Sequence, residues 1–181
     1  QVVKEYRDAP LAEVQKLLRS GYHEERLLAL LLLVHVFERG DEALRKKIFG
    51  LYLKNTKYIN NWDLVDLSAP KIVGPYLDHS SRSQLYRFVR SKNLWERRIA
   101  VLATFPYIRK GDFIDALALA ETLLSDDHDL MHKAVGWMLR EVGKKDVAVL
   151  EGFLRKHHGR MPRTALRYAI ERFPEAERKK Y

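Results

Sequence analysis

Residues 58–66 read YINNWDLVD, and the rest of the chain can be organised around this stretch. Its asparagine pair can cap the start of a helix, and Asp63 falls in the first turn, where a negative charge suits the helix macrodipole. Trp62 and Asp66 lie four positions apart, so a large aromatic ring and a carboxylate share one helix face. Asp66 lies beyond the first turn among apolar neighbours, where a carboxylate needs a specific reason. The stretch predicts the beginning of a helix that carries chemistry on one face.

A comparable helix start returns along the chain. Arg26, Arg97, Lys133 and Arg163 each begin a similar stretch, and Trp62 occupies the position between the first two. The five starts are separated by 36, 35, 36 and 30 residues. This period is typical of solenoids built from helical pairs, slightly short of the HEAT range. We therefore expect an all-α, HEAT-like α-α superhelix of about five helical pairs.

Capping residues, prolines and glycines place further helix ends, and no alternating strand pattern with turn dipeptides occurs. Pro70 and Gly74 are expected to kink or split the helix that starts at Trp62, and Pro106 to interrupt the helix that starts at Trp95. The other expected helices cover residues 10–19, 23–38, 41–54, 81–90, 112–124, 128–142, 146–157 and 162–173. The prediction is a single HEAT-like repeat domain over residues 1–181.

Composition bears on the compartment of the protein and on whether it has a membrane partner. The absence of cysteine excludes disulfides and thiolate chemistry and favours a cytoplasmic protein. The most apolar run, residues 27–37, contains His35 and is shorter than the roughly 20 residues of a membrane span, so no membrane partner is expected. The chain begins with Gln1, and we expect it to be a fragment or a trimmed chain.

The net charge of +9 is unevenly distributed. Residues 82–110 carry eight basic and one acidic side chain, residues 111–129 carry six acidic and no basic ones, and residues 130–181 carry 13 basic and six acidic ones. One interpretation is a basic surface that faces a polyanion, with strongly salt-dependent affinity. The other is a solvated surface with charges of both signs.

The solenoid hypothesis favours a basic surface that faces a polyanion. In a solenoid of helical pairs, the second helix of each pair lies beside that of the next pair, and together these helices line one surface. The alternative is that long basic side chains merely cover the helix faces. The repeated helix starts predict a basic, aromatic groove that contains Arg26, Trp62, Arg97 or Arg98, Lys133 or Trp137, and Arg163 or Arg167.

Three segments resemble signatures of the AlkD-like DNA alkylation repair family. Residues 61–66 read NWDLVD, residues 93–98 read NLWERR, and residues 133–141 read KAVGWMLRE. Their order and spacing match as well, and the resemblance covers residues 11–173. Members of this family are HEAT-like solenoids that excise positively charged N3- and N7-alkylated purines from duplex DNA in base excision repair. The resemblance implies an alkylpurine DNA glycosylase that acts on such DNA, and we expect it to work as a monomer without metal or cofactor.

The resemblance also assigns roles to individual residues. It makes Asp66 the catalytic carboxylate, Trp62 and Trp137 the aromatic pair beside the damaged nucleotide, and Arg98 and Arg140 contacts to the DNA backbone. Additional candidate groove contacts are Arg97, Lys133 and Arg163. The chemistry is consistent, because an ionised carboxylate stabilises positive charge on the sugar or aligns a water, and indole faces attract cations.

Other interpretations stay open at this point. Asp66 could form a structural salt bridge with Arg98 or Arg97, and the tryptophans Trp62 and Trp137 could serve in packing, as we expect for Trp95. The family has further helices ahead of this start, and we expect this chain to lack some of them. The alternatives to a glycosylase are a non-catalytic module that binds DNA of unusual structure and a protein-interaction scaffold.

Overall fold

The computed structural model describes residues 2–181, and this range contains helices and connecting turns but no strand. The predicted all-α class is confirmed. In chain order the α-helices are α1 (Val2–Glu5), α2 (Leu11–Leu18), α3 (His23–Arg39), α4 (Glu42–Lys54), α5 (Trp62–Ser68), α6 (Val73–Asp78), α7 (Ser83–Phe88), α8 (Leu94–Leu102), α9 (Phe105–Lys110), α10 (Ile114–Thr122), α11 (Asp129–Lys145), α12 (Val147–His157), α13 (Arg163–Ala169) and α14 (Glu175–Arg178). Two short 3-10 helices, η1 (Thr56–Tyr58) and η2 (His158–Arg160), follow α4 and α12. None of the helices within residues 2–181 combines the length and the apolar composition needed to cross a bilayer.

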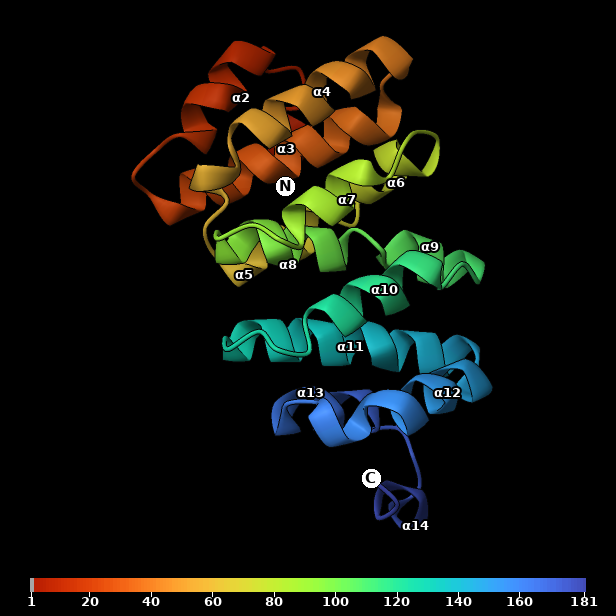
Figure 1. Cartoon of the computed structure of the whole chain (residues 1–181). Helices are drawn as coiled ribbons and strands as arrows, with labels where there is room; N and C mark the ends of the chain where they lie inside the picture. The colour runs from red at the N-terminus through yellow and green to blue at the C-terminus, as the bar shows by residue number, and fades with distance from the viewer. Residues whose placement is uncertain (1) are drawn as a thin grey trace.

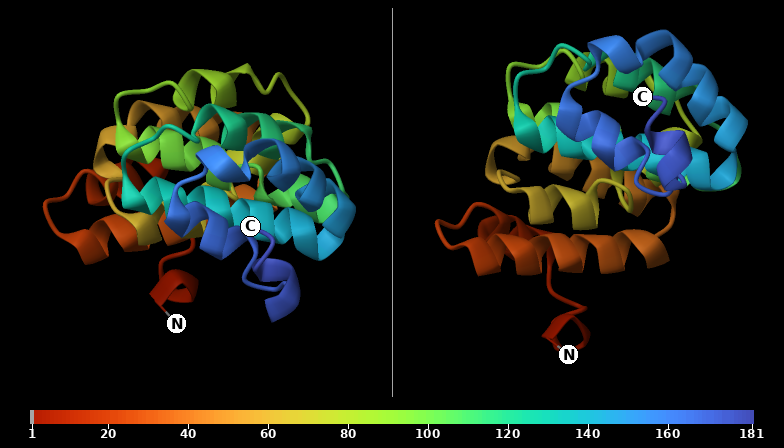
Figure 2. Two further views of the ribbon diagram at one scale, coloured as in Figure 1. Left: turned by 60° about the horizontal axis from the view of Figure 1, so that its bottom comes forward. Right: turned by 90° about the horizontal axis from the view of Figure 1, so that it is seen from below.

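The helices form two layers. The second helices α3, α5, α8, α11 and α13 contact one another in that order. In the other layer α2 packs on α3, α7 on α8, and both α10 and α12 on α11, while α4 packs on α3 and α6. Figure 1 shows the pairs stacked from α2–α4 at the top to α12–α13 at the bottom, and the short α1 and α14 project from the layers in Figure 2, left. The predicted α-α solenoid is confirmed.

Prolines divide two of the second helices, as the sequence predicts. Pro70 lies between α5 and α6, and Pro106 lies in the first turn of α9, directly after α8. Proline lacks an N–H and its ring clashes with the preceding turn, so it kinks or breaks the interior of a helix. α11 contains no proline and runs unbroken over Asp129–Lys145. The layer therefore contains two long helices, α3 and α11, and shorter ones at α5 and α8.

Predicted side-chain caps begin one helix in each layer, α5 and α4. The side chain of Asn61 accepts a hydrogen bond from the Trp62 N–H at 2.7 Å, and Asp41 accepts one from the Leu44 N–H at 2.8 Å. Each cap satisfies a backbone donor that has no partner within its own helix. The cap at Asn61 thus fixes the start of α5 and with it the position of Trp62, the first residue of that helix.

Two glycines allow adjacent repeats to approach closely. A Cβ atom built on Gly136 would lie 2.5 Å from the carbonyl oxygen of Ala165 and 2.5 Å from the Cβ of Tyr168. A Cβ on Gly74 would lie 2.5 Å from the carbonyl oxygen of Ala103. Both contacts involve backbone atoms of the next repeat, so any larger side chain forces the two repeats apart.

We expect Gly136→Ala to lower the free energy of unfolding by about 1–3 kcal/mol, because overpacking displaces α13 from α11. Gly50→Ala is the matched control, since a Cβ at Gly50 meets nothing within 4 Å in the interior of α4. That substitution should stabilise the protein by about 0.5–1 kcal/mol through helix propensity. Urea unfolding of the three proteins measures both effects, and equal stability of the Gly136 variant and the wild type contradicts the close packing.

The acidic block of the sequence lies against the basic block that precedes it. Arg82 pairs with Asp112 at 2.7 Å and with Asp115 at 2.6 Å, and Arg97 pairs with Asp126 at 2.6 Å. These partly buried pairs join one repeat to the next. Part of the charge alternation in the sequence therefore reflects pairing within the protein, and only the remainder is open to a polyanion.

Candidate functional site

A cavity of about 380 Å³ opens on the layer of second helices. Each lining residue comes from α5, α8, α11 or α13, so four successive repeats contribute. The lining residues are Trp62, Arg98, Leu130, Lys133, Trp137, Arg140 and Tyr168. Five of the residues predicted from the sequence thus come together around one opening.

Asp66 joins this cavity through Arg98. The Nε of Arg98 donates to one carboxylate oxygen of Asp66 at 2.8 Å, and its Nη2 donates to the other at 2.7 Å. The remaining nitrogen, Nη1, donates to the carbonyl oxygen of Leu130 at 2.6 Å. The Arg98 side chain is 6% exposed and that of Asp66 is 17% exposed. Of the two pairings open from the sequence, the structure therefore has the one with Arg98, and the carboxylate is held in a single orientation.

The two tryptophans have different surroundings. Trp62, the first residue of α5, is 53% exposed, which is a large exposed area for an indole ring. Trp137 is partly buried: its indole N–H donates to Glu141 at 3.1 Å, and its ring centre lies 6.2 Å from that of Phe105. Trp95 packs against the core, as expected. Trp62 thus offers a free aromatic face, whereas Trp137 both packs and lines the cavity.

The cations at the rim already have carboxylate partners. Lys133 pairs with Asp129 at 2.7 Å, and this hydrogen bond raises the pKa of Lys133 and lowers the pKa of Asp129. Arg140 pairs through Nη1 with Glu171, while its buried Nε has no hydrogen-bond partner among the described residues. A polyanion at this rim competes with the carboxylates for Lys133 and Arg140.

Two predicted groove residues lie elsewhere. Arg97 donates through Nη1 to the carbonyl oxygen of Ser91 at 2.9 Å and pairs with Asp126. Arg26 donates in the same way to the carbonyl oxygen of Ser20 at 2.9 Å. In both repeats the arginine side chain donates a hydrogen bond to the backbone of the turn that precedes its own helix. Arg26 and Arg97 thus have contacts within the protein, and of the alternatives Arg97 and Arg98 it is Arg98 that lines the cavity.

Arg163, the third candidate groove contact, lies outside this cavity and lines a second one with Arg167. Tyr168 lines both cavities and was not among the predicted residues. Its signal in the sequence is positional: Tyr168 follows Trp137 by 31 residues, close to the 30 that separate the helix starts at 133 and 163. The carbonyl oxygen of Leu130 accepts a hydrogen bond from Arg98. A backbone group is present at every residue, so the sequence contains no signal for this contact.

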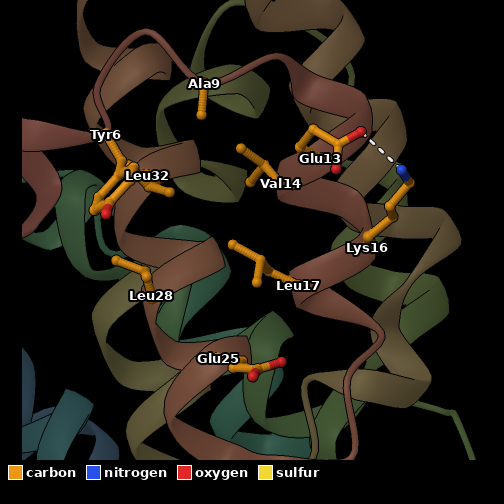
Figure 3. A pocket seen from close by; sticks show the side chains of 9 residues that line it. All are labelled: Tyr6, Ala9, Glu13, Val14, Lys16, Leu17, Glu25, Leu28 and Leu32. Atoms are coloured by element: carbon orange, nitrogen blue, oxygen red, sulfur yellow. Dashed lines mark hydrogen bonds and ion pairs between the residues drawn. The ribbon is translucent and has the colours of Figure 1, made fainter.

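Another cavity, of about 590 Å³, lies between α2 and α3 (Figure 3). Its walls are mainly apolar, with Leu17, Leu28 and Leu32 facing the opening. The charged side chains are Glu13 and Glu25 with Lys16, and Lys16 pairs with Glu13 at 2.7 Å. A cavity of this composition does not favour a polyanion.

The histidine pair of α11 has backbone partners. The Nδ1 of His128 accepts from the Leu130 N–H at 3.2 Å, and the Nε2 of His132 contacts the carbonyl oxygen of Asp126. Within the described part of the chain, no three histidine, aspartate or glutamate side chains are grouped so that they could hold a metal ion.

Comparisons with known proteins bear on the family and the fold of the chain. A family model described as "DNA alkylation repair enzyme" matches residues 1–173. A solved structure described as "Predicted DNA alkylation repair enzyme from Enterococcus faecalis" is 17% identical, with a TM-score of 0.74, and the match covers 97% of this chain and 82% of that one. At this identity the likeness concerns the fold alone. No curated protein matches the sequence.

Proposed function

The chain belongs to the DNA alkylation repair enzyme family, and from this premise we propose that it is a DNA glycosylase that removes positively charged N3- and N7-alkylated purines from duplex DNA. The observation that carries the proposal is the carboxylate of Asp66, held by Arg98 beside a cavity with an exposed indole. An ion pair that served stability alone would need no exposed tryptophan next to it.

The reaction places few demands on the protein. When the bond between C1′ and the purine nitrogen breaks, its electron pair moves into the base and neutralises the positive charge there. Positive charge develops on the sugar instead, and a water oxygen then bonds to C1′ and loses a proton. The task of the site is to stabilise that charge and to admit one water.

Asp66 is suited to this task in its observed geometry. A carboxylate has about four lone-pair positions, and Arg98 occupies one on each oxygen. The free positions can face a cationic sugar or a water, while the guanidinium prevents the carboxylate from rotating. We therefore assign Asp66 the catalytic role and Arg98 a positioning role, in addition to the backbone contact that the resemblance implies.

Trp62 and Trp137 are proposed to bind the lesion and the adjacent sugar. An indole face attracts a cation by about 0.5–2 kcal/mol, which favours a methylated, charged purine over a neutral one. Lys133 and Arg140 at the rim are proposed to contact phosphates, which offer stronger competition than isolated surface carboxylates.

The direct test is base release from methylated duplex DNA, with 3-methyladenine and 7-methylguanine resolved. We expect release of one or both bases by the wild-type protein and a steep loss of duplex binding as salt rises. Salt-sensitive binding without release favours a non-catalytic DNA-binding module. Absence of duplex binding favours a protein scaffold and contradicts the proposal.

Trp62→Ala is expected to slow excision of cationic purines by about 2- to 30-fold, the equivalent of one cation–π contact. The thermal midpoint should change little because the ring is 53% exposed. Tyr22→Ala is the matched control, an aromatic residue 72% exposed at another helix start. The measurement is the ratio of release of 7-methylguanine to release of hypoxanthine, a neutral altered purine. An unchanged ratio in the Trp62 variant contradicts the aromatic contact.

A further inference from the structure

A second cavity, of about 530 Å³, lies at the C-terminal end of the stack between α13 and α14. Three arginines, Arg163 and Arg167 of α13 and Arg178 of α14, line it above a buried apolar floor of Leu166 and Ile170. We refer to it as the arginine cavity. Arg163 and Arg167 lie four positions apart and therefore share one helix face.

The charges of the arginine cavity have no partner in the part of the chain that the structure describes. None of its three arginines forms an ion pair or a side-chain hydrogen bond with residues 2–181, and all three are exposed. The one carboxylate side chain in the lining, that of Glu171, pairs with Arg140. Elsewhere the basic residues Arg82, Arg97 and Lys133 are paired. The arginine cavity is thus a concentration of uncompensated positive charge.

The arginine cavity adjoins the site of Asp66. Tyr168 lines both cavities, and the ion pair between Arg140 and Glu171 links the rim of one to the wall of the other. A ligand that extends beyond the first cavity along α13 therefore meets the arginines next. Planar guanidinium groups bind phosphate through two hydrogen bonds at once.

We propose that the arginine cavity binds backbone phosphates of the DNA on one side of the damaged nucleotide, and so fixes the register of the duplex against Asp66. This inference rests on the proposed function. The contact is independent of base sequence, because phosphates carry no sequence information. It supplies affinity and positioning, while discrimination stays with the first cavity.

The test uses the double variant Arg163→Ala/Arg167→Ala of the full chain. The matched control is Arg87→Ala/Arg90→Ala, which removes two exposed arginines at α7 in the other layer. Both variants are first compared with the wild type by thermal unfolding. Binding to undamaged duplex is then measured against salt concentration. Loss of two phosphate contacts should reduce the slope of log affinity against log salt by about 1.8, with no such change in the control.

A second measurement locates the contact. Duplexes carry a stable abasic analogue and are shortened on one flank or on the other. We expect the wild type and the control to lose affinity when one particular flank is shortened, and the double variant to be insensitive to that shortening. The inference is overturned if the double variant loses as much affinity as the wild type when either flank is shortened. It is also overturned if the salt slope of the double variant is unchanged.

The two proposals fail in different ways. If the wild type releases no base but the double variant still shows the reduced slope, the phosphate site stands and the glycosylase proposal falls. If the wild type releases base and the double variant binds like the wild type, the glycosylase proposal stands and the phosphate site falls.

Discussion

Asp66→Asn should lower the rate of base release by about 10²–10³-fold, the typical loss when one electrostatic contact to the transition state is removed. The substitution keeps the shape of the side chain and removes its charge. Affinity for duplex DNA should stay within a few-fold of the wild type, because phosphate contacts dominate binding. Single-turnover release of methylated purines measures the first quantity, and titration with a duplex that contains an abasic analogue measures the second.

Asp63→Asn is the matched control for this experiment. Asp63 lies in the same helix, and its carboxylate pairs with His23 at 2.7 Å rather than with Arg98. Both substitutions remove one negative charge from α5, so an effect of net charge alone appears in both. Release at the wild-type rate by Asp66→Asn, or equal losses in the two variants, contradicts the catalytic assignment.

Arg98→Ala should lower the free energy of unfolding by about 3–5 kcal/mol, because it leaves a partly buried carboxylate without its partner. The carbonyl oxygen of Leu130 also loses its donor. Arg98→Lys should recover only part of the loss, since an ammonium cannot supply the two parallel hydrogen bonds of a guanidinium. Denaturant unfolding of the wild type and of these two variants measures the series.

Arg140→Ala is the comparison variant and should lower the free energy of unfolding by only about 0–1 kcal/mol. Its partner Glu171 is 53% exposed, and surface ion pairs contribute little to stability. The double variant Asp66→Asn/Arg98→Ala should lose less stability than the two single losses combined, as expected for directly coupled residues. If Arg98→Ala unfolds like the wild type and only its DNA affinity falls, Arg98 is a backbone contact and not a support for Asp66.

The sequence predicted the architecture well because its signals are local. The cap at Asn61 and the breaks at Pro70 and Pro106 depend on backbone chemistry within one turn. The repeat of the helix starts then required only that similar helices stack. The last pair was less regular, and α13 ends at Ala169 rather than at Phe173.

The site was less accessible to sequence reasoning, because its contacts cross repeats. Arg97 and Arg98 are neighbours about 100° apart on a helix, and no local rule distinguishes the one that braces a turn from the one that holds Asp66. The pairing of Arg97 with Asp126 involves an acidic residue in the next repeat. Tyr168 was overlooked since the final interval is shorter than the others.

The chain of contacts from Asp66 through Arg98 to Leu130 spans three successive second helices, α5, α8 and α11. In a solenoid each repeat contacts only its neighbours, so fraying at either end can occur without melting of the middle. Opening of any one of these three repeats, however, separates the carboxylate from its support. Loss of base release on heating should therefore follow the cooperative unfolding of the central repeats, while α2 can open earlier without consequence for the chemistry.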